Sequence, residues 1–235
     1  MITIENLRKS YGKLQVLNDV SVTFDAGKVV SVIGPNGAGK TTVSKCILGM
    51  VLPDSGDIRI NGESVLNKHA YRSQIGYMPQ IGKYPENMKI RQVIEMIRDI
   101  RKDVKEVDEE LIGLYGLKDM YDKRMGSLSG GTKQKVSAAL AFMFNPQILI
   151  LDEPTAGLDP ISAEILKSKI LKEKKKGKLI LITSHIMSEV EEVADEVLCL
   201  VDGQVKFHET IKSIKAQANE ERLSRAIAKI MNGED

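Results

Sequence analysis

The residues best suited to chemistry start with a glycine-rich stretch near the N-terminus. Its members are consecutive: Gly34, Pro35, Asn36, Gly37, Ala38, Gly39, Lys40, Thr41 and Thr42. The stretch follows the apolar run 29–33 and precedes a predicted helix, which is the strand–loop–helix order of a P-loop. Glycines let backbone N–H groups wrap a triphosphate, while Lys40 would neutralise its β- and γ-phosphates and the Thr41 hydroxyl would ligate Mg²⁺. The pattern predicts a nucleoside triphosphate site rather than a plain tight turn.

A pair of carboxylates, Asp152 and Glu153, directly follows the apolar run 147–151. Carboxylates at the carboxyl end of a buried strand are costly unless they hold a metal or move a proton. With a P-loop upstream, we assign Asp152 to Mg²⁺, directly or through water, and Glu153 to orienting and deprotonating the attacking water. The alternative is a strand end that emerges into solvent.

A second glycine pair precedes the helical segment 133–144, in the order Ser129, Gly130, Gly131. Ser129 suits a helix N-cap, and the glycines leave backbone N–H groups open to an anion. Since the first glycine-rich loop already supplies a phosphate site, a flexible loop that only caps a helix is the default alternative. These residues alone leave both interpretations open.

The elements that must position these residues follow from hydrophobic periodicity. Strands are expected at 1–7, 16–24, 28–33, 57–60, 73–78, 147–151, 179–183, 197–201 and 204–208. Helices are expected at 42–48, 90–97, 108–115, 133–144 and 160–177, and in a tail at 211–231. Nothing between about 85 and 145 is typical of a strand, which predicts a helical subdomain inserted into an α/β core.

Three finer expectations concern helix ends. Asp159 should cap the helix that begins at Pro160, and the run 172–176 should be a solvated cationic face near its end. A capping-box pattern, Ser188 to Glu191, should open a further helix. The apolar face of the 211–231 tail should pack on its own domain, with docking on a partner as the alternative.

Bulk properties exclude several classes of protein. The 235 residues suffice for one sizeable α/β domain, and the net charge of +2 gives no basic field suited to nucleic acid. Cys46 and Cys199 lie in apolar contexts without metal-ligand spacing, which favours a reducing compartment. No apolar run approaches the length of a membrane span, and the N-terminus lacks the pattern of a signal peptide. We therefore expect membrane attachment only through a partner.

Together and in this order, the three tracts resemble the ATP-binding subunit of an ABC transporter over essentially the whole chain. The stretch 34–42 corresponds to Walker A, 128–132 to the signature loop, and Asp152 and Glu153 to Walker B and its catalytic carboxylate. Thr132 replaces the usual glutamine of the signature, and the D-loop has an unusual Ala-Gly start. Neither departure touches a residue that the chemistry requires. The resemblance adds Tyr11 as the aromatic that stacks on adenine, Val16 beside the base, Gln80 as Mg²⁺ ligand and sensor, Asp159 in the D-loop and His185 as the switch histidine.

The resemblance implies a P-loop NTPase fold of the ABC ATPase type, an α/β architecture. Its core sheet is mostly parallel, with an N-terminal antiparallel β subdomain and the inserted helices. We predict an ATP-binding domain at 1–209 and a short helical tail at 210–235. His69 and His208 match nothing in the family and are read as surface or structural residues.

The resemblance also implies a cycle. Two copies would pair head to tail around two ATP with Mg²⁺ and drive an integral-membrane permease from the cytoplasmic face. The resemblance is greatest to subunits of exporters of drug, polysaccharide or copper-processing type. One alternative is a soluble ABC-type ATPase acting on ribosomes, DNA or iron–sulfur assembly. The other is a P-loop kinase or GTPase, against which stand Glu153, the signature loop and the lack of a guanine-reading motif.

Overall fold

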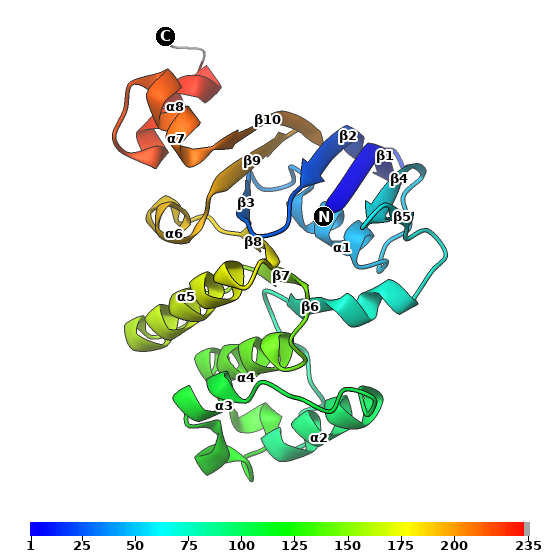
Figure 1. Ribbon diagram of the computed structural model, residues 1–235, viewed down its shortest axis with the longest axis vertical. Helices are drawn as coiled ribbons and strands as arrows, with labels where there is room; N and C mark the ends of the chain where they lie inside the picture. Colours follow the sequence, from blue (N-terminus) through cyan, green and yellow to red (C-terminus); the bar gives the residue numbers. More distant parts are fainter. Residues whose placement is uncertain (233–235) are drawn as a thin grey trace.

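The computed structural model of the chain describes residues 1–232, and its elements form two sheets with helices packed around them (Figure 1). Most expected elements are present, with ends that differ by a few residues. In chain order they are β1 (Ile2–Tyr11), β2 (Leu14–Phe24), β3 (Val29–Ile33), α1 (Lys40–Ile47), β4 (Ser55–Ile60), β5 (Glu63–Ser64), β6 (Ile75–Met78), α2 (Ile90–Ile100), α3 (Glu110–Leu114), α4 (Gly130–Phe142), β7 (Ile148–Asp152), α5 (Pro160–Lys175), β8 (Leu179–Thr183), α6 (Met187–Val193), β9 (Glu196–Val201), β10 (Gln204–Thr210), α7 (Ile211–Ala218) and α8 (Leu223–Asn232).

The first sheet is antiparallel, with the strand order β2-β1-β4-β5. Strands β1 and β2 form a long hairpin, in which Tyr11 pairs with Leu14 beside the turn. A two-residue turn, Asn61-Gly62, joins β4 to β5, and both residues have positive φ, as its sequence predicts. This sheet is the N-terminal antiparallel subdomain.

The second sheet has the order β10-β9-β3-β8-β7-β6, and only β10 runs antiparallel to its neighbour. All residues of β3, β7 and β8 are buried, which fits strands covered on both faces. The carboxyl ends of parallel strands lie at one edge of a sheet. The loops after β3, β6, β7 and β8 therefore meet at that edge, which confirms the predicted fold class.

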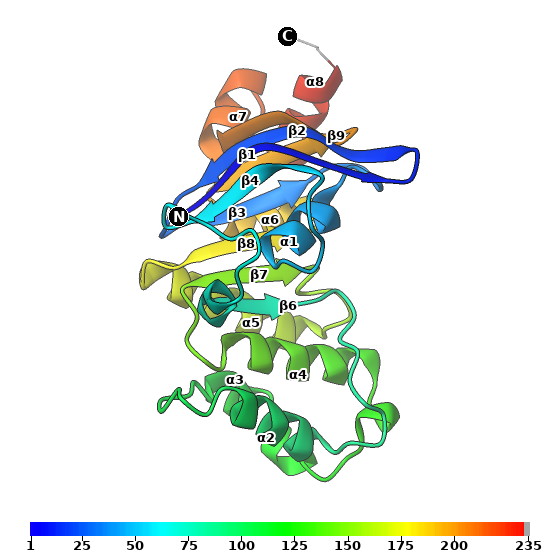
Figure 2. The same cartoon turned by 90° about the vertical axis from the view of Figure 1, so that its right-hand side faces the viewer.

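The segment 85–145 is helical, and the described structure has no strand in it apart from one isolated bridge between Lys89 and Arg124. Helices α2, α3 and α4 lie at the end of the molecule opposite the first sheet (Figure 2). The buried side chains of these helices form one cluster with β7 and α5. The inserted helices thus share a core with the sheet that carries the predicted site.

Several expected element ends are wrong. Strand β6 begins at Ile75 because Ala70–Gln74 forms a 3₁₀ helix. The capping box at Ser188 is absent, since α6 begins at Met187 and its N-cap residue, Ile186, has no capping side chain. The 211–231 tail is two helices, α7 and α8, separated where Asn219 takes a left-handed conformation.

The tail packs on its own domain, as expected. Leu223 and Ala226 of α8 are fully buried and join a cluster with Val197 and Cys199 of β9. Within residues 1–232 no helix has the length and apolar character needed to cross a membrane. The division into units at residue 209 stays a prediction.

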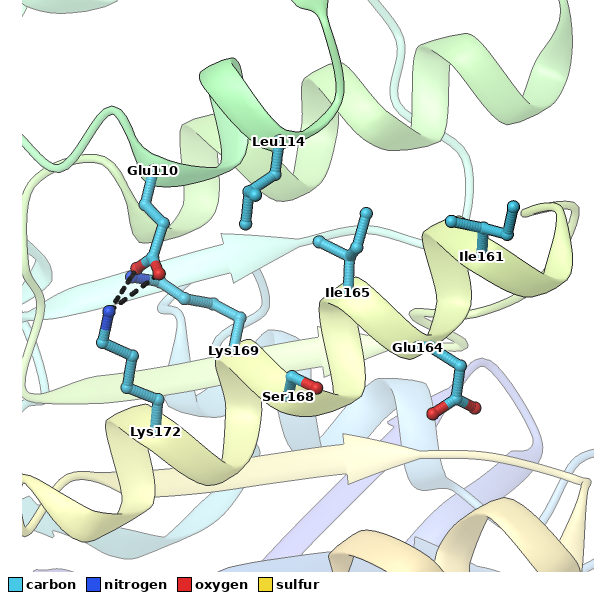
Figure 3. Close-up of a pocket in the computed structure, with 8 residues that line it drawn as sticks. All are labelled: Glu110, Leu114, Ile161, Glu164, Ile165, Ser168, Lys169 and Lys172. Carbon is cyan, nitrogen blue, oxygen red and sulfur yellow. Dashed lines mark hydrogen bonds and ion pairs between the residues drawn. The ribbon is translucent and has the colours of Figure 1, made fainter.

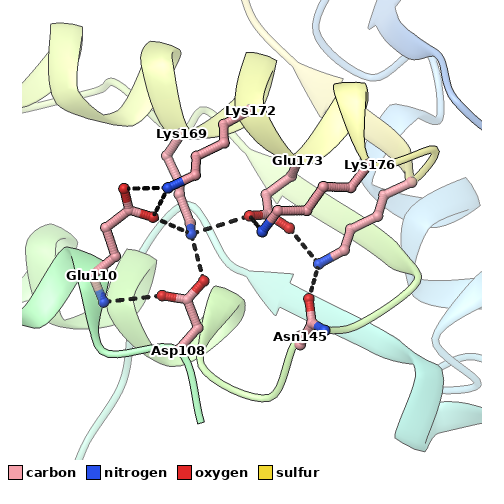
Figure 4. A network of polar contacts seen from close by, with 8 residues as sticks. Asp108, Glu110, Asn145, Lys169, Lys172, Glu173 and Lys176 are labelled. Atoms are coloured by element: carbon pink, nitrogen blue, oxygen red, sulfur yellow. Dashed lines mark hydrogen bonds and ion pairs between the residues drawn. The ribbon is translucent and has the colours of Figure 1, made fainter. Parts of the chain in front are cut away.

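The expectation of a solvated face at 172–176 is wrong for Glu173. This side chain is 1% exposed and pairs with Lys169, Lys176 and Lys178, as Figure 4 shows in part. Lys172 and Lys176 remain exposed at the rim. Burial of a charge needs such partners, and two of the three, Lys169 and Lys178, lie outside the run.

Candidate active site

A cleft of about 290 Å³ lies where the loops after β3, β6, β7 and β8 meet. Most of its lining residues are ones that the sequence singles out. The lining comprises Leu14, Val16, Asn36, Gly37, Ala38, Gly39, Lys40, Thr41, Thr42, Gln80, Asp152, Glu153 and His185. Segments up to 171 residues apart, from Leu14 to His185, thus contribute to one cleft.

The glycine-rich loop has two positions that only glycine fits. Gly34 has φ +143°, and a Cβ there would lie 2.0 Å from the Leu200 carbonyl oxygen. Gly39 has φ +100°, precedes α1, and leaves 2.6 Å between an added Cβ and Leu17 Cδ2. The loop therefore lies tightly against β2 and β9, with the first-turn N–H groups of α1 directed at the cleft.

Lys40 anchors this loop from within. Its Nζ donates hydrogen bonds to the carbonyl oxygens of Gly34 (2.7 Å) and Pro35 (3.0 Å), and the residue is 8% exposed. Burial lowers the pKa of the Lys40 ammonium, although the charges of Glu153 and Asp152 partly oppose that shift. The Lys40 ammonium hydrogen-bonds these carbonyl oxygens, and Lys40 also lines the cleft. A phosphate bound there would be a stronger hydrogen-bond acceptor than a carbonyl oxygen.

Asp152 is the last residue of β7 and is 7% exposed. Its Oδ1 accepts a short hydrogen bond from the Thr183 hydroxyl at the end of β8. This bond holds one oxygen and leaves the other carboxylate oxygen for a ligand in the cleft. Thr183 therefore orients the acid that we assign to Mg²⁺.

Glu153 has a strained backbone. Its φ of +49° lies in the left-handed region, which non-glycine residues rarely adopt. Its N–H donates to the Thr183 carbonyl and hydroxyl oxygens, both at 3.1 Å. Observed strain of this kind, held by neighbouring bonds, often marks a side chain whose direction matters for function.

The Glu153 carboxylate faces His185, whose Nε2 lies 3.0 Å from Glu153 Oε1. Burial raises the pKa of Glu153, and the nearby Asp152 adds to the rise, whereas His185 and Lys40 oppose it. A raised pKa makes a carboxylate a better proton acceptor near neutral pH. The side chain is 13% exposed and that of His185 54%, so the pair faces the open side of the cleft.

Oxygen donors suited to Mg²⁺ share this cleft: the Thr41 hydroxyl, the Gln80 amide and the Asp152 carboxylate. Among residues 1–232, no three His, Cys, Asp or Glu side chains cluster in a metal-binding arrangement. Mg²⁺ commonly binds one or two protein oxygens and completes its shell with phosphates and water. The residues present fit that mode.

Seven predicted site residues lie outside the cleft lining: Tyr11, Gly34, Pro35, Ser129, Gly130, Gly131 and Asp159. Tyr11 ends β1 and is 49% exposed, with the Lys9 ammonium 5.6 Å from its ring centre. Ser129 caps α4 by accepting a hydrogen bond from Thr132 N at 3.2 Å. Asp159 caps α5 through Ser162 N at 2.9 Å, as predicted, and pairs with Lys135 at 2.8 Å.

Three residues around the site were not predicted from the sequence. Leu14 lines the cleft two positions before Val16 on β2, so the period of a strand could have indicated it. Thr183 bonds the Asp152 carboxylate and the Glu153 backbone N–H, and Gln134 of α4 donates to the Glu153 carbonyl oxygen at 3.3 Å. The partners of these last two come from distant segments, which no local pattern indicates.

A second hollow, of about 410 Å³, lies between α3 and α5 (Figure 3). Leu114, Ile161 and Ile165 line it, and Glu110 bonds Lys172 at one end. Its lining has no glycine, and its charged side chains already form ion pairs: Glu110 with Lys169 and Lys172, and Glu164 with Lys167. The cleft beside Lys40 is therefore the site for chemistry.

Comparison with known proteins agrees with this geometry. The family model described as ABC transporter matches residues 17–156. The Nod factor export ATP-binding protein I of Rhizobium sp. (strain N33) is 34% identical over 209 residues, covering 86% of this chain and 68% of that protein. The lipopolysaccharide export system ATP-binding protein LptB of Haemophilus influenzae is 34% identical over 234 residues, covering 96% and 95%.

A solved structure described as the ATP-binding subunit of an ABC transporter has a TM-score of 0.88 to this chain at 28% identity, covering 98% of this chain and 99% of the other. The match thus extends over both sheets and the inserted helices. This chain belongs to the ABC transporter family, as an ATP-binding subunit that hydrolyses ATP.

Proposed function

We propose that this subunit forms a head-to-tail dimer around two ATP and two Mg²⁺ and drives an integral-membrane permease. The observation that carries the proposal is the separation of two phosphate-binding features in one chain. Ser129 and Gly130 are exposed at the start of α4, and neither lines the cleft beside Lys40. The first-turn N–H groups of a helix lack intrahelical partners, so this helix start suits an anion from another subunit.

Within each composite site, the residues divide the work. The first-turn amides of α1 and Lys40 bind and orient the triphosphate, while Tyr11 and Val16 contact the base. Thr41, Gln80 and Asp152 would hold Mg²⁺, which neutralises charge on the phosphates when bound. Glu153 accepts a proton from the attacking water, and His185 stabilises charge on the transferring group. Ser129, Gly130 and Gly131 of the other subunit bind the same γ-phosphate, with Asp159 in the adjacent loop.

Hydrolysis removes the anion that joins the two subunits, so the dimer loosens. Gln80 lines the cleft and comes shortly before the inserted helices in the chain, which suits it to pass this change toward a permease. We place the subunit on the cytoplasmic face of a membrane, attached through that permease. The described chain itself contributes no spanning helix.

We infer export rather than import, because both relatives described above are named as export proteins. The second of these relatives is named for the export of a lipopolysaccharide, which favours the polysaccharide class among the drug, polysaccharide and copper-processing types. The permease determines the substrate in this arrangement, so the ATP-binding subunit constrains it weakly.

The composite site is tested by complementation between two variants. Lys40→Ala should weaken nucleotide binding by roughly 10- to 100-fold, because a charge-assisted contact is lost. Gly130→Asp places a negative charge on the signature loop, where an added Cβ has open space. Neither variant alone should hydrolyse ATP.

A 1:1 mixture of these variants should recover about a quarter of wild-type activity, since half of the dimers are mixed and each has one intact composite site. If the sites instead lay within single chains, neither chain would hold a complete one. Absence of any recovery would therefore refute the dimer. Unchanged nucleotide affinity of Lys40→Ala would count against the P-loop assignment.

The permease is tested by co-purification. Pull-down of the intact subunit from membranes in mild detergent should recover a polytopic membrane protein, whose presence changes the ATPase rate. Stimulation by ribosomes or DNA instead would favour the soluble ABC-type ATPases and overturn the transport proposal. A Lys135→Met variant cannot replace this test. Lys135 lies outside the cleft, but its substitution removes the ion pair with Asp159.

A further inference from the structure

Helix α4 contacts the loop 153–159, here called the catalytic loop, at three points. At its start, Gly131 lies so close to this loop that an added Cβ would be 2.6 Å from the Gly157 carbonyl oxygen. One turn later Lys135 pairs with Asp159. Between them, the Gln134 side chain reaches the beginning of the loop.

Gln134 is buried, with 4% of its surface exposed. Its Nε2 donates to the Glu153 carbonyl oxygen at 3.3 Å and lies 3.5 Å from the Pro154 carbonyl oxygen. A buried amide is costly unless its hydrogens are satisfied, so this placement is specific. Gln134 does not line the cleft, and its two hydrogen-bond partners are carbonyl oxygens rather than groups assigned to nucleotide binding.

Both sides of the Glu153 backbone are therefore held. Thr183 accepts hydrogen bonds from the N–H, and Gln134 donates to the C=O. The left-handed φ of +49° costs on the order of 1 kcal/mol for a non-glycine residue and persists only where neighbours enforce it. Loss of either bond would remove part of what enforces this conformation, and with it the placement of the carboxylate beside His185.

We propose that Gln134 is a positioning residue for Glu153 and links the signature helix to the catalytic carboxylate. The same helix begins at Ser129, which in the proposed dimer covers the ATP of the other subunit. Closure around one nucleotide would thus set the base that serves the second nucleotide. This inference rests on the proposed dimer and on the proposed role of Glu153.

The first test replaces Gln134 by a residue of similar shape that has no hydrogen-bond donor. Gln134→Met should lower kcat by roughly 10- to 100-fold, because a misplaced catalytic group costs about that much. ATP affinity should stay near the wild-type value, and the melting temperature should fall by only a few degrees, because buried carbonyl oxygens lose a donor. Gln147→Met is the matched control: this side chain is exposed at the start of β7, and the variant should behave as wild type.

A second variant gives a signature that a purely structural role would not. Gln134→Glu keeps the shape, but its carboxylate faces carbonyl oxygens with no hydrogen to donate. As pH falls and this carboxyl is protonated, it regains a donor. The ratio of kcat in Gln134→Glu to kcat in wild type should therefore rise as pH falls from 8 to 6. Taking the ratio removes the pH dependence that the two proteins share.

The outcomes separate this inference from the function on which it rests. A flat ratio, or parallel losses of kcat, affinity and melting temperature, would overturn the positioning role. If Gln134→Met fails to fold, the ratio for Gln134→Glu still decides. If Glu153→Gln loses activity while both Gln134 variants keep it, only this inference fails. If Glu153→Gln keeps full activity, the proposed function fails as well.

Discussion

Two regions of the molecule bury charged side chains, and they treat charge in opposite ways. One is the cleft beside Lys40. The other is the ion network that joins α5 and the turn after it to the start of α3 and the loop that follows α4 (Figure 4). We define it as Asp108, Glu110, Asn145, Lys169, Lys172, Glu173, Lys176 and Lys178.

In the ion network, ion pairing affects the pKa values more strongly than burial does. Burial by itself would lower the pKa of Lys169, but hydrogen bonds to Asp108, Glu110 and Glu173 reverse the effect and raise it. Burial would likewise raise the pKa of Glu173, but hydrogen bonds from Lys176, Lys178 and Lys169 lower it to about 2. Both groups are therefore shifted toward their charged forms.

In the cleft, burial affects the pKa values more strongly than ion pairing does. The pKa of Lys40 is lowered and that of Glu153 is raised, so both groups are shifted toward their neutral forms. The hydrogen bonds of Lys40 go to carbonyl oxygens instead of carboxylates. The difference teaches that the ion network uses its charges to hold the helices together, whereas the cleft keeps its charges available to a ligand.

The largest effect should come from removing the proton acceptor in the cleft. Glu153→Gln should slow ATP turnover by about 10²–10⁴, the usual range for one general base, while ATP binding persists. Steady-state kinetics together with equilibrium binding of ATP would measure both quantities. An unimpaired rate would show that Glu153 is not the proton acceptor. The contrast between the cleft and the ion network would then have no functional basis.

The next largest effect should come from the ion network. Lys169→Met leaves Asp108 and Glu173 short of a buried counter-charge, which should lower the free energy of unfolding by about 3–5 kcal/mol. ATP affinity should not change in the folded protein, because Lys169 lies outside the cleft. Urea unfolding followed by circular dichroism measures the loss.

The matched control is Lys172→Met on the same helix. Its ammonium bonds Glu110, but the side chain is 53% exposed, so the loss should be at most about 1 kcal/mol. Equal losses in the two variants would show that burial does not distinguish these pairs. The ion network would then be a surface feature, and the contrast with the cleft would vanish.

Much of the site could be predicted because each motif directly adjoins an apolar run. Gly34 follows β3, Asp152 ends β7 and His185 comes two residues after β8, so parallel pairing alone brings them together. The glycine positions were also readable, since only glycine tolerates the close approach at Gly34 and Gly39. Local pattern and fold agree at these residues.

The remainder depends on contacts between distant segments. The run 172–176 has the pattern of a solvated face, but Lys178 and Lys169 bury Glu173 by approaching it from outside that run. In the sequence, Gln134 resembles any polar residue of a helix. Only the fold brings the Glu153 carbonyl oxygen within hydrogen-bond distance of its side chain. The pattern at Ser188 fails because α6 begins one residue before it. Sequence periodicity indicates the polar and apolar faces of a helix or strand. The contacts of Glu173 and Gln134 depend instead on which faces pack against each other in the fold.

The smallest expected effect is on the free energy of unfolding, which Glu→Gln substitutions in the two regions should change in opposite directions. Because the pKa of Glu153 is raised on folding, its carboxylate costs stability once the pH exceeds the unfolded value, and the cost is complete above the folded value. Glu153→Gln should therefore stabilise the protein by about 0.5–1 kcal/mol at neutral pH, as expected where function opposes stability. The gain should shrink as pH falls through that window.

Glu173 provides the comparison for this measurement, because its pKa is lowered to about 2 on folding. Its stabilisation is present above the unfolded value of about 4.3 and is lost as pH falls toward 2. Glu173→Gln should therefore destabilise the protein at neutral pH, with a deficit that shrinks under acid. Unfolding curves of both variants between pH 7 and 3 would test the two signs together. If Glu153→Gln were also destabilising at neutral pH, its carboxylate would be satisfied in the fold, and the cleft would not be holding charge in reserve.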